Sequence, residues 1–140
     1  MKVLFDTNVV LDVLLARKPY ATAAAQLFAL VERGEIQGTV CATTITTIHY
    51  LAVRAVGSKG AEKHLRQLLS LFEVAPVTGE VVASALDLGF ADFEDAVVHE
   101  AACACGVSAI VTRNAKDFAK ASVPVLSPVE FLAAVAAADA

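Results

Sequence analysis

Short apolar runs alternate with longer segments of mixed polarity along this chain. The runs are rich in valine, leucine and isoleucine, which is typical of buried strands. Because successive residues of each run are apolar, both faces of the sheet that they form are expected to be covered. We expect strands at residues 2–5, 38–42, 72–77, 108–112 and 124–126.

The longer segments carry apolar residues three and four positions apart, which is the spacing of one face of an α-helix. In residues 22–33, Leu27, Leu30 and Val31 fall on one face, and Gly34 follows as a helix stop. A turn at residues 57–60 is expected to separate two of the helices. Helices are predicted at residues 8–15, 22–33, 44–56, 61–71, 79–88 and 92–105, and from Pro128 onward.

Regular alternation of strands and helices indicates a parallel sheet with helices on both faces. The predicted fold class is therefore α/β: a three-layer α/β/α domain with a mainly parallel sheet of four to five strands. We expect residues 1–140 to form a single domain of ordinary length. Ligands of such sheets bind beyond the carboxyl ends of the strands, so the residues that follow each strand are the first candidates for a site.

The composition excludes a disordered chain, since 57% of the residues are hydrophobic and 19% are charged. The most apolar stretches, residues 9–16 and 123–138, are interrupted by charged residues or prolines. They fall short of the roughly 20 apolar residues of a membrane-spanning helix. The first acidic residue, Asp6, comes too early for a signal peptide. We therefore expect a cytoplasmic protein with no membrane contact.

The net charge of −4 argues against a protein that coats nucleic acid with a broad basic surface. It leaves room for a nucleic-acid enzyme with a local basic rim. The three cysteines, Cys41, Cys103 and Cys105, are an odd number and form a poor disulfide framework. We expect them to be small buried apolar side chains in a reducing compartment.

Carboxylates stand at three of the junctions between strands and helices. Asp6 directly follows the first strand, and Asp117 comes five residues after the strand that ends at Thr112. Asp92 and Asp95 are three residues apart at a helix start, so both can face the same way. Clustered carboxylates repel unless a cation neutralises them, and oxygen ligands favour Mg²⁺ or Mn²⁺. Taken singly, each acid also fits a helix cap or a surface loop.

Four stretches, residues 3–12, 92–96, 110–118 and 125–132, occur in an order that resembles one known family. They are similar to the PIN-domain ribonucleases, the family of the VapC-type toxins of bacterial toxin–antitoxin pairs. The resemblance implies a metal-dependent endoribonuclease that cleaves RNA phosphodiester bonds and acts as the toxin of a type II pair. It also implies Mg²⁺ or Mn²⁺ as the cofactor, RNA as the substrate, a cognate antitoxin and a homodimer.

The family's acidic positions carry over to four residues of this chain. The resemblance implies that Asp6, Asp95 and Asp117 are catalytic and hold the metal, with Asp92 as a further catalytic acid. Residues with hydroxyl or amide side chains would support these acids by hydrogen bonding. These supporting residues are Thr7, Asn8, Thr47, Thr112 and Asn114.

One position departs from the family. The family's glutamate on the helix after the second strand is replaced here by Thr47, and no acid occurs between Glu35 and Glu62. Three consequences remain open: weaker metal binding, recruitment of Asp92 as the fourth acid, or loss of activity. The alternative function is therefore a non-catalytic PIN-like module that binds RNA or a partner protein. A structure-specific DNA nuclease is a further rival, but this chain has no room for the helical arch of such enzymes.

Two further features concern partners. Basic residues beside the expected cleft could contact RNA phosphates, or could be ordinary solvated residues. The helices at residues 22–33 and 44–71 carry more apolar residues than one small sheet readily covers, which predicts an exposed groove for a partner or alternatively a helical core. The basic residues are Arg17, Lys18, Arg113, Lys116 and Lys120, and the groove candidates are Phe28, Tyr50, Leu51 and Leu65.

Overall fold

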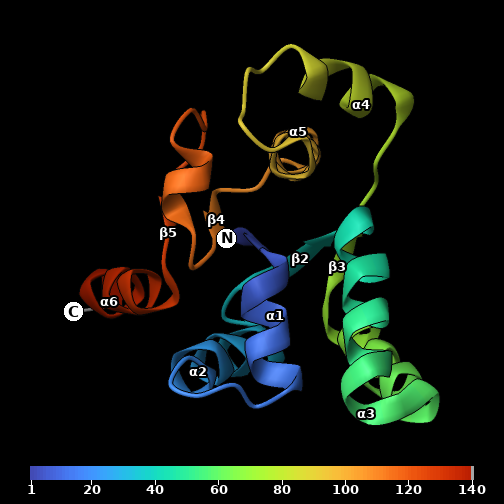
Figure 1. The fold of residues 1–140 in the computed structure, drawn as a ribbon. Coiled ribbons are helices and arrows are strands. Elements are labelled where there is room, and N and C mark those ends of the chain that lie inside the picture. Colours follow the sequence, from blue (N-terminus) through green and yellow to red (C-terminus); the bar gives the residue numbers. More distant parts are fainter. Residues whose placement is uncertain (140) are drawn as a thin grey trace.

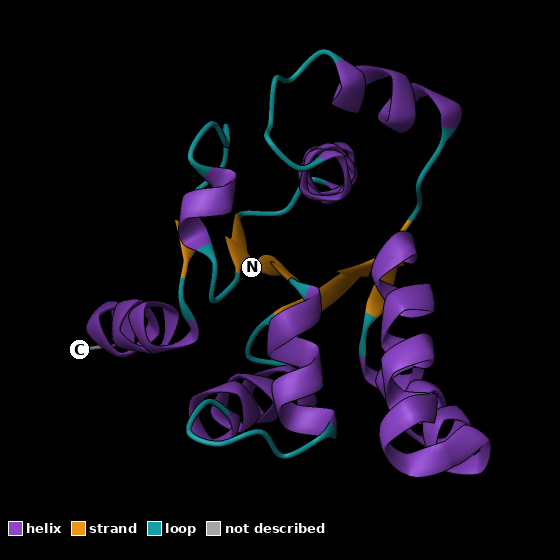
Figure 2. Cartoon of the chain, viewed as in Figure 1, coloured by secondary structure: helices purple, strands orange, loops and turns teal. Residues whose placement is uncertain are grey.

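The computed structural model describes residues 1–139 and places a five-stranded sheet between two layers of helices (Figure 1 and Figure 2). The strand order is β3-β2-β1-β4-β5, and every neighbouring pair is parallel. The predicted α/β class is thus confirmed. The elements are β1 (Lys2–Phe5), α1 (Thr7–Leu14), α2 (Ala21–Glu32), β2 (Gln37–Cys41), α3 (Ala42–Leu71), β3 (Glu73–Ala75), α4 (Gly79–Leu86), α5 (Phe93–Cys105), β4 (Ala109–Val111), the 3-10 helix η1 (Ala115–Phe118), β5 (Val125–Leu126) and α6 (Pro128–Asp139).

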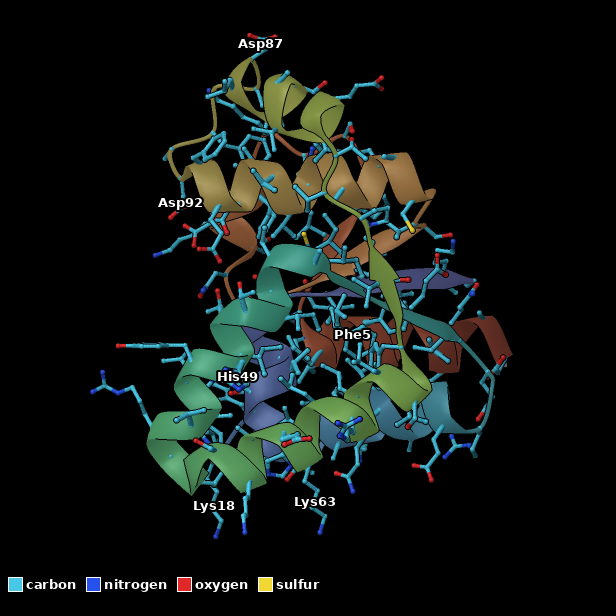
Figure 3. The ribbon with its side chains drawn as sticks, turned by 90° about the vertical axis from the view of Figure 1, so that its right-hand side faces the viewer. Phe5, Lys18, His49, Lys63, Asp87 and Asp92 are labelled. Atoms are coloured by element: carbon cyan, nitrogen blue, oxygen red, sulfur yellow. The ribbon has the colours of Figure 1, made fainter. Side chains whose placement is uncertain are left out.

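The three layers follow from the alternation of side chains along the central strand β1. Val3 and Phe5 pack on one face with residues of α1, α2, α3 and α6, whereas Leu4 packs on the other face with residues of α4, α5 and η1. In Figure 1, α4 and α5 lie above the sheet and α1 and α2 below it. Figure 3 shows Phe5 in the middle of the molecule. Because both faces of the strand are buried, its sequence is apolar at consecutive positions.

Helix α3 joins two segments that the sequence separates. It runs from Ala42 to Leu71 but bends at Gly57, whose φ of +81° is a conformation that residues with a Cβ rarely adopt. The predicted turn at residues 57–60 is therefore a kink at one glycine. The element η1 was not predicted, because four residues are too few to show a helical period.

Three of the four candidates for the predicted apolar groove are partly buried against the core. Phe28 is partly buried and packs against the core, with its ring centroid 5.7 Å from that of Phe5 and 5.0 Å from that of Phe72. Leu51 and Leu65 pack against the same core. The kinked α3 lies against α1, β2 and β3, so some of its apolar side chains pack on the core. Of the four groove candidates, Tyr50 is the one with an exposed side chain. No helix within residues 1–139 combines the length and apolar character needed to cross a bilayer.

The pairing of β1 with β4 brings two polar residues together at one edge of the sheet. Phe5 at the end of β1 pairs with Val111 at the end of β4. The next residues are Asp6 and Thr112, and the backbone N–H of Asp6 donates to the carbonyl oxygen of Val111 at 3.0 Å. The candidate site therefore lies where parallel-sheet proteins bind their ligands, beyond the carboxyl ends of central strands.

Candidate active site

Asp6 is a nearly buried carboxylate with a fixed orientation. It caps the N-terminus of α1, and its Oδ1 accepts a hydrogen bond from the backbone N–H of Thr7 at 2.8 Å. Its Oδ2 accepts a hydrogen bond from the hydroxyl of Thr112 at 2.7 Å. Asp6 can therefore be both a helix cap and a site residue, because the hydrogen bond of the cap holds its carboxylate at the edge of the sheet.

Side chains from α1 and from the end of β4 support Asp6. The amide nitrogen Nδ2 of Asn8 donates to Thr112 Oγ1 at 3.2 Å and to Asp6 Oδ2 at 3.4 Å. The backbone N–H of Asn114 donates to Thr112 Oγ1 at 3.1 Å, and that of Arg113 donates to Asn8 Oδ1 at 3.2 Å. The structure thus brings Thr7, Asn8, Thr112 and Asn114 together around Asp6. Asn8 and Thr112 take part through their side chains, whereas Thr7 and Asn114 contribute their backbone N–H groups.

The start of α5 brings further acids to Asp6. Asp92 is the N-cap of α5 and accepts from the backbone N–H of Asp95 at 3.2 Å, and Figure 3 shows it at the free end of this helix. Asp95 and Glu94, in the first turn, line an open pocket of about 280 Å³ together with Asp6. We call it the acidic pocket. Glu94 was not among the predicted site residues, because an acid in the first turn of a helix is explained by the helix dipole alone.

Asp117 lies near this pocket but lines a different one. It belongs to η1 and lines a neighbouring pocket of about 250 Å³ with Lys116, Lys120 and Phe90. Its carboxylate nevertheless raises the pKa of Asp6 and of Asp95, so the charges are close enough to interact. The structure therefore places Asp117 beside the acidic pocket rather than in its wall.

The acids raise one another's pKa values. Burial, and then the negative charges of Asp6, Asp92, Asp117 and Glu94, raise the pKa of Asp95 to about 7. Burial is also the largest cause that raises the pKa of Asp6, against the hydrogen bonds from Thr112 and Thr7, which lower it. The pKa of Glu94 is raised by burial and by the charges of Asp92 and Asp6. Asp95 can therefore gain or lose a proton near neutral pH.

The donor set fits a hard divalent cation in an open site. All the acids offer oxygen ligands, which Mg²⁺ and Mn²⁺ prefer. Within residues 1–139, the group of three His, Cys, Asp or Glu residues whose ligand atoms all lie within 4.8 Å of one another is elsewhere, at His99, Glu100 and Cys103. The acids of the pocket are therefore not closed into a protein cage. Mg²⁺ commonly uses one or two carboxylates and completes its shell with water and phosphate, so an open arrangement suits it.

A buried carboxylate holds two arginines at the rim of the acidic pocket. Asp12 of α1 is fully buried and accepts from Arg17 Nε at 2.9 Å and from Arg113 Nε and Nη2 at 2.7 and 3.2 Å. Arg17 Nη2 also donates to the carbonyl oxygen of Asn8 at 3.1 Å. Both arginines line the pocket with Asp6 and Asp95. The pocket thus combines acids with a fixed positive rim.

Comparison with known proteins identifies the family. A family model described as "PIN domain" matches residues 2–116. The chain belongs to the PIN domain family. A search of curated proteins found no match.

Solved structures share the fold of this PIN domain. A toxin–antitoxin complex from Klebsiella pneumoniae matches with a TM-score of 0.69 and 24% identity, covering 90% of this chain and 97% of that one. FitAcB from Neisseria gonorrhoeae matches with a TM-score of 0.71 and 22% identity, covering 91% and 98%. The sarcin-ricin loop cleaving toxin VapC20 from Mycobacterium tuberculosis matches with a TM-score of 0.63 and 15% identity, covering 77% and 86%.

The PIN domain presents threonines where α3 approaches the pocket. Thr44 is fully buried, and its hydroxyl receives a hydrogen bond from the hydroxyl of Thr7 at 3.2 Å. Thr47, one turn later, donates to the carbonyl oxygen of Thr43 at 3.4 Å and does not line the acidic pocket. Thr44 therefore links α3 to Thr7, the residue that follows Asp6. The sequence pattern alone did not separate it from Thr47, because both lie on one helix face.

His99 of the PIN domain has a structural role. Its Nε2 accepts from the backbone N–H of Ser122 at 3.0 Å, so a neutral ring carries its proton on Nδ1. Nδ1 lies 3.1 Å from Glu100 Oε2 and can donate to it. Both ring nitrogens are therefore engaged, and His99 ties α5 to the loop before β5. For this reason we do not interpret His99, Glu100 and Cys103 as a metal centre.

In the absence of a divalent cation, the PIN domain is expected to lose stability as the pH rises from about 4 to about 7. The folded protein binds a proton on Asp95 more tightly than the unfolded chain does, because the pKa of this group is raised from 3.8 to about 7. The stability that this proton contributes is therefore full below the pKa of the unfolded chain, 3.8. It is lost as the pH rises through the pKa of the folded protein, about 7. Melting temperatures in EDTA across this pH range measure the slope.

The variant Asp95→Asn should show a flatter dependence of melting temperature on pH than the wild type. Asp87→Asn serves as the matched control, because Asp87 is exposed at the end of α4 and its loss should leave the slope unchanged. A wild-type slope in Asp95→Asn would contradict the interpretation that the acids of this pocket repel one another.

Proposed function

We propose that this chain is a metal-dependent endoribonuclease and the toxin component of a type II toxin–antitoxin pair. The observation that carries the proposal is the shared pocket of Asp6 and Asp95, with Arg17 and Arg113 at its rim. Acids that can hold a divalent cation, next to cations that can hold a phosphate, are the two requirements of phosphodiester hydrolysis. Membership of the PIN domain family supports the same function.

The chain's own residues divide the work of such a reaction. Asp6, oriented by Thr7 and Thr112, presents a fixed carboxylate to the cation. Arg17 and Arg113 offset the negative charge of the phosphate. Asp95, which lines the same pocket, would hold the cation together with Asp6. When bound, Mg²⁺ or Mn²⁺ would offset further charge on the phosphate and favour deprotonation of the water.

Asp117 and Asp92 take lesser roles in this proposal. Asp117 lines the neighbouring pocket, where its carboxylate could accept a hydrogen bond from a water molecule bound to the cation or from a group of the substrate. One carboxylate oxygen of Asp92 accepts the hydrogen bond that caps α5, so Asp92 contributes to the site mainly through its negative charge. We therefore propose that Asp6 and Asp95 hold the metal and that Asp117 contributes from the neighbouring pocket.

The second candidate function is a PIN-like module that binds RNA or a partner without cleaving it. The feature that favours it is the start of α3, which carries no acid. Thr47 stands at the position that the resemblance assigns to the family's glutamate, and its hydroxyl donates to the carbonyl oxygen of Thr43. A hydroxyl can position a water molecule but supplies no negative charge. With one acid fewer, the affinity for the cation would be lower. The nuclease and the binding module both predict that the chain binds RNA.

Cleavage of single-stranded RNA separates the two candidates. A labelled RNA incubated with the purified protein should be cut with Mn²⁺ or Mg²⁺ and should stay intact in EDTA, because the acids alone supply no positive charge to the phosphate. A DNA of the same sequence serves as the substrate control. RNA that binds but stays intact at millimolar Mn²⁺ would support the binding module and contradict the nuclease.

We also propose a cognate antitoxin and a homodimer, acting in the cytoplasm. Among the proteins with this fold, one is described as a toxin–antitoxin complex, which supports an antitoxin partner. Helix α3 leaves apolar side chains exposed that such partners could cover. They are Tyr50, Val56, Leu69 and Leu71. Light scattering of the chain alone, and of the chain expressed with the product of its neighbouring gene, measures both assemblies.

A further inference from the structure

Two pockets of this molecule share a wall. The acidic pocket adjoins a second pocket of about 560 Å³, and Arg113 and Asn114 line both. The second pocket lies between the segment that joins α1 to α2, the end of β4 and the start of α6. Its other lining residues include Pro19, Tyr20, Ser127, Pro128 and Val129. A ligand that fills both pockets must therefore pass Arg113.

Arg113 is held rigidly at this border. Its guanidinium is bonded to the buried Asp12 through Nε and Nη2 and lies over the ring of Tyr20, 3.8 Å from the ring centroid. Two partners thus fix the plane of the guanidinium. Within residues 1–139, no side chain or carbonyl accepts a hydrogen bond from Nη1 of Arg113. A phosphate oxygen at the border could accept hydrogen bonds from Nη1.

The second pocket matches the chemistry of a nucleobase. Pro19, Tyr20, Pro128 and Val129 give it apolar walls, whereas Asn114 and Ser127 add hydrogen-bonding groups. A nucleobase likewise has apolar faces and a polar edge, and unpaired bases are commonly bound by stacking on aromatic side chains. An apolar peptide would fit the walls but would offer no acceptor to the Nη1 group of Arg113, which is left over after the bonds of Nε and Nη2 to Asp12. The border arginine therefore favours a nucleotide.

We propose that the second pocket binds one unpaired base of a single-stranded RNA, whose adjoining phosphate is held by Arg113 at the entrance of the acidic pocket. The inference rests on the proposed ribonuclease function and extends it to substrate recognition. A base held here fixes the position of the neighbouring phosphate relative to Asp6 and Asp95. The pocket therefore selects single-stranded over double-stranded RNA, because a paired base cannot leave its helix without cost.

The variant Val129→Glu tests the pocket without disturbing the fold. Val129 lines the pocket, is 68% exposed and lies in the first turn of α6, where an acid is favourable to the helix. The control is Leu86→Glu, which makes the same change in charge at a residue that is 70% exposed on α4. Circular dichroism should show both variants folded, since neither side chain is buried.

Binding is measured by fluorescence anisotropy in EDTA, so that cleavage does not contribute. The probes are a short labelled single-stranded RNA and a series of the same RNA with one base removed at successive positions. Loss of the base at one position should weaken binding to the wild type about tenfold, as expected for one stacked base. Val129→Glu should bind the intact RNA about tenfold more weakly and lose this discrimination. Leu86→Glu should behave as the wild type.

Several results would overturn the proposal. If Val129→Glu weakens binding of the intact and the base-deleted RNAs by equal factors, the effect is general repulsion and there is no base pocket. Equal affinities of the wild type and Val129→Glu, or no binding of RNA, would also overturn it. So would unchanged RNA binding together with loss of a co-expressed partner protein, because the pocket would then be a protein interface.

The same measurements distinguish this proposal from the proposed function. RNA binding with a position-specific effect of base removal, but without cleavage in Mn²⁺, would support the base pocket and overturn the nuclease. Cleavage at equal rates by the wild type and Val129→Glu, with no discrimination between intact and base-deleted RNA, would support the nuclease and overturn the base pocket.

Discussion

Replacement of Asp6 by Asn should lower the rate of RNA cleavage by more than about 100-fold. Loss of a residue that only supports a metal ligand commonly costs 10–100-fold in affinity or activity, so loss of a direct ligand should cost at least as much. The fold should survive, because Asn has the same shape and can still accept from the backbone N–H of Thr7. Burial raises the pKa of Asp6, so removal of its charge is favourable, whereas loss of the hydrogen bond from the Thr112 hydroxyl is unfavourable. The melting temperature should therefore change little.

Rates of cleavage in Mn²⁺, with melting curves of the same samples, test this expectation. Asp87→Asn is the control, since it removes one exposed carboxylate from the far end of α4. Asp117→Asn should lower the rate by a smaller factor than Asp6→Asn, because Asp117 lines the neighbouring pocket. Full activity in a folded Asp6→Asn protein would remove Asp6 from the reaction and would leave the assignment of the pocket without its central residue.

The variant Asp12→Asn should be destabilised by about 3 kcal/mol, which corresponds to a fall of about 10 °C in melting temperature for a chain of this length. Asp12 is fully buried and accepts three hydrogen bonds from Arg17 and Arg113. An Asn side chain would turn an N–H₂ donor towards these donors and would leave the two positive charges without a counterion. The arginines are partly exposed, so water offsets some of the loss.

Thermal and urea unfolding of Asp12→Asn measure this effect, again with Asp87→Asn as the control. The two variants remove the same charge, so their difference reports the buried contacts of Asp12. Asp12→Asn should also weaken RNA binding, because the guanidinium of Arg113 would lose its fixed orientation. A melting temperature equal to that of the control would show that the arginines find other partners and that Asp12 does not organise the rim.

The local sequence determined most of the elements of this protein. The apolar run that forms β1 needs no tertiary information, because a strand buried on both faces is apolar at every position. The acids at helix starts were equally visible: Asp6 caps α1 and Asp92 caps α5. The bend of α3 at Gly57 was predicted in outline as a turn, since glycine is the residue that adopts a positive φ without strain.

The tertiary structure decided which of these residues meet. Arg113 and Asp12 are 101 residues apart, and they pair because β4 lies next to β1 in the sheet. The same strand order sets Thr112 against Asp6, and the packing of α3 on α1 brings Thr44 to Thr7. Periodicity reports contacts within one helix or strand, three or four residues apart at most. Contacts between elements depend on strand order and helix docking, which are fixed only when the whole chain has packed.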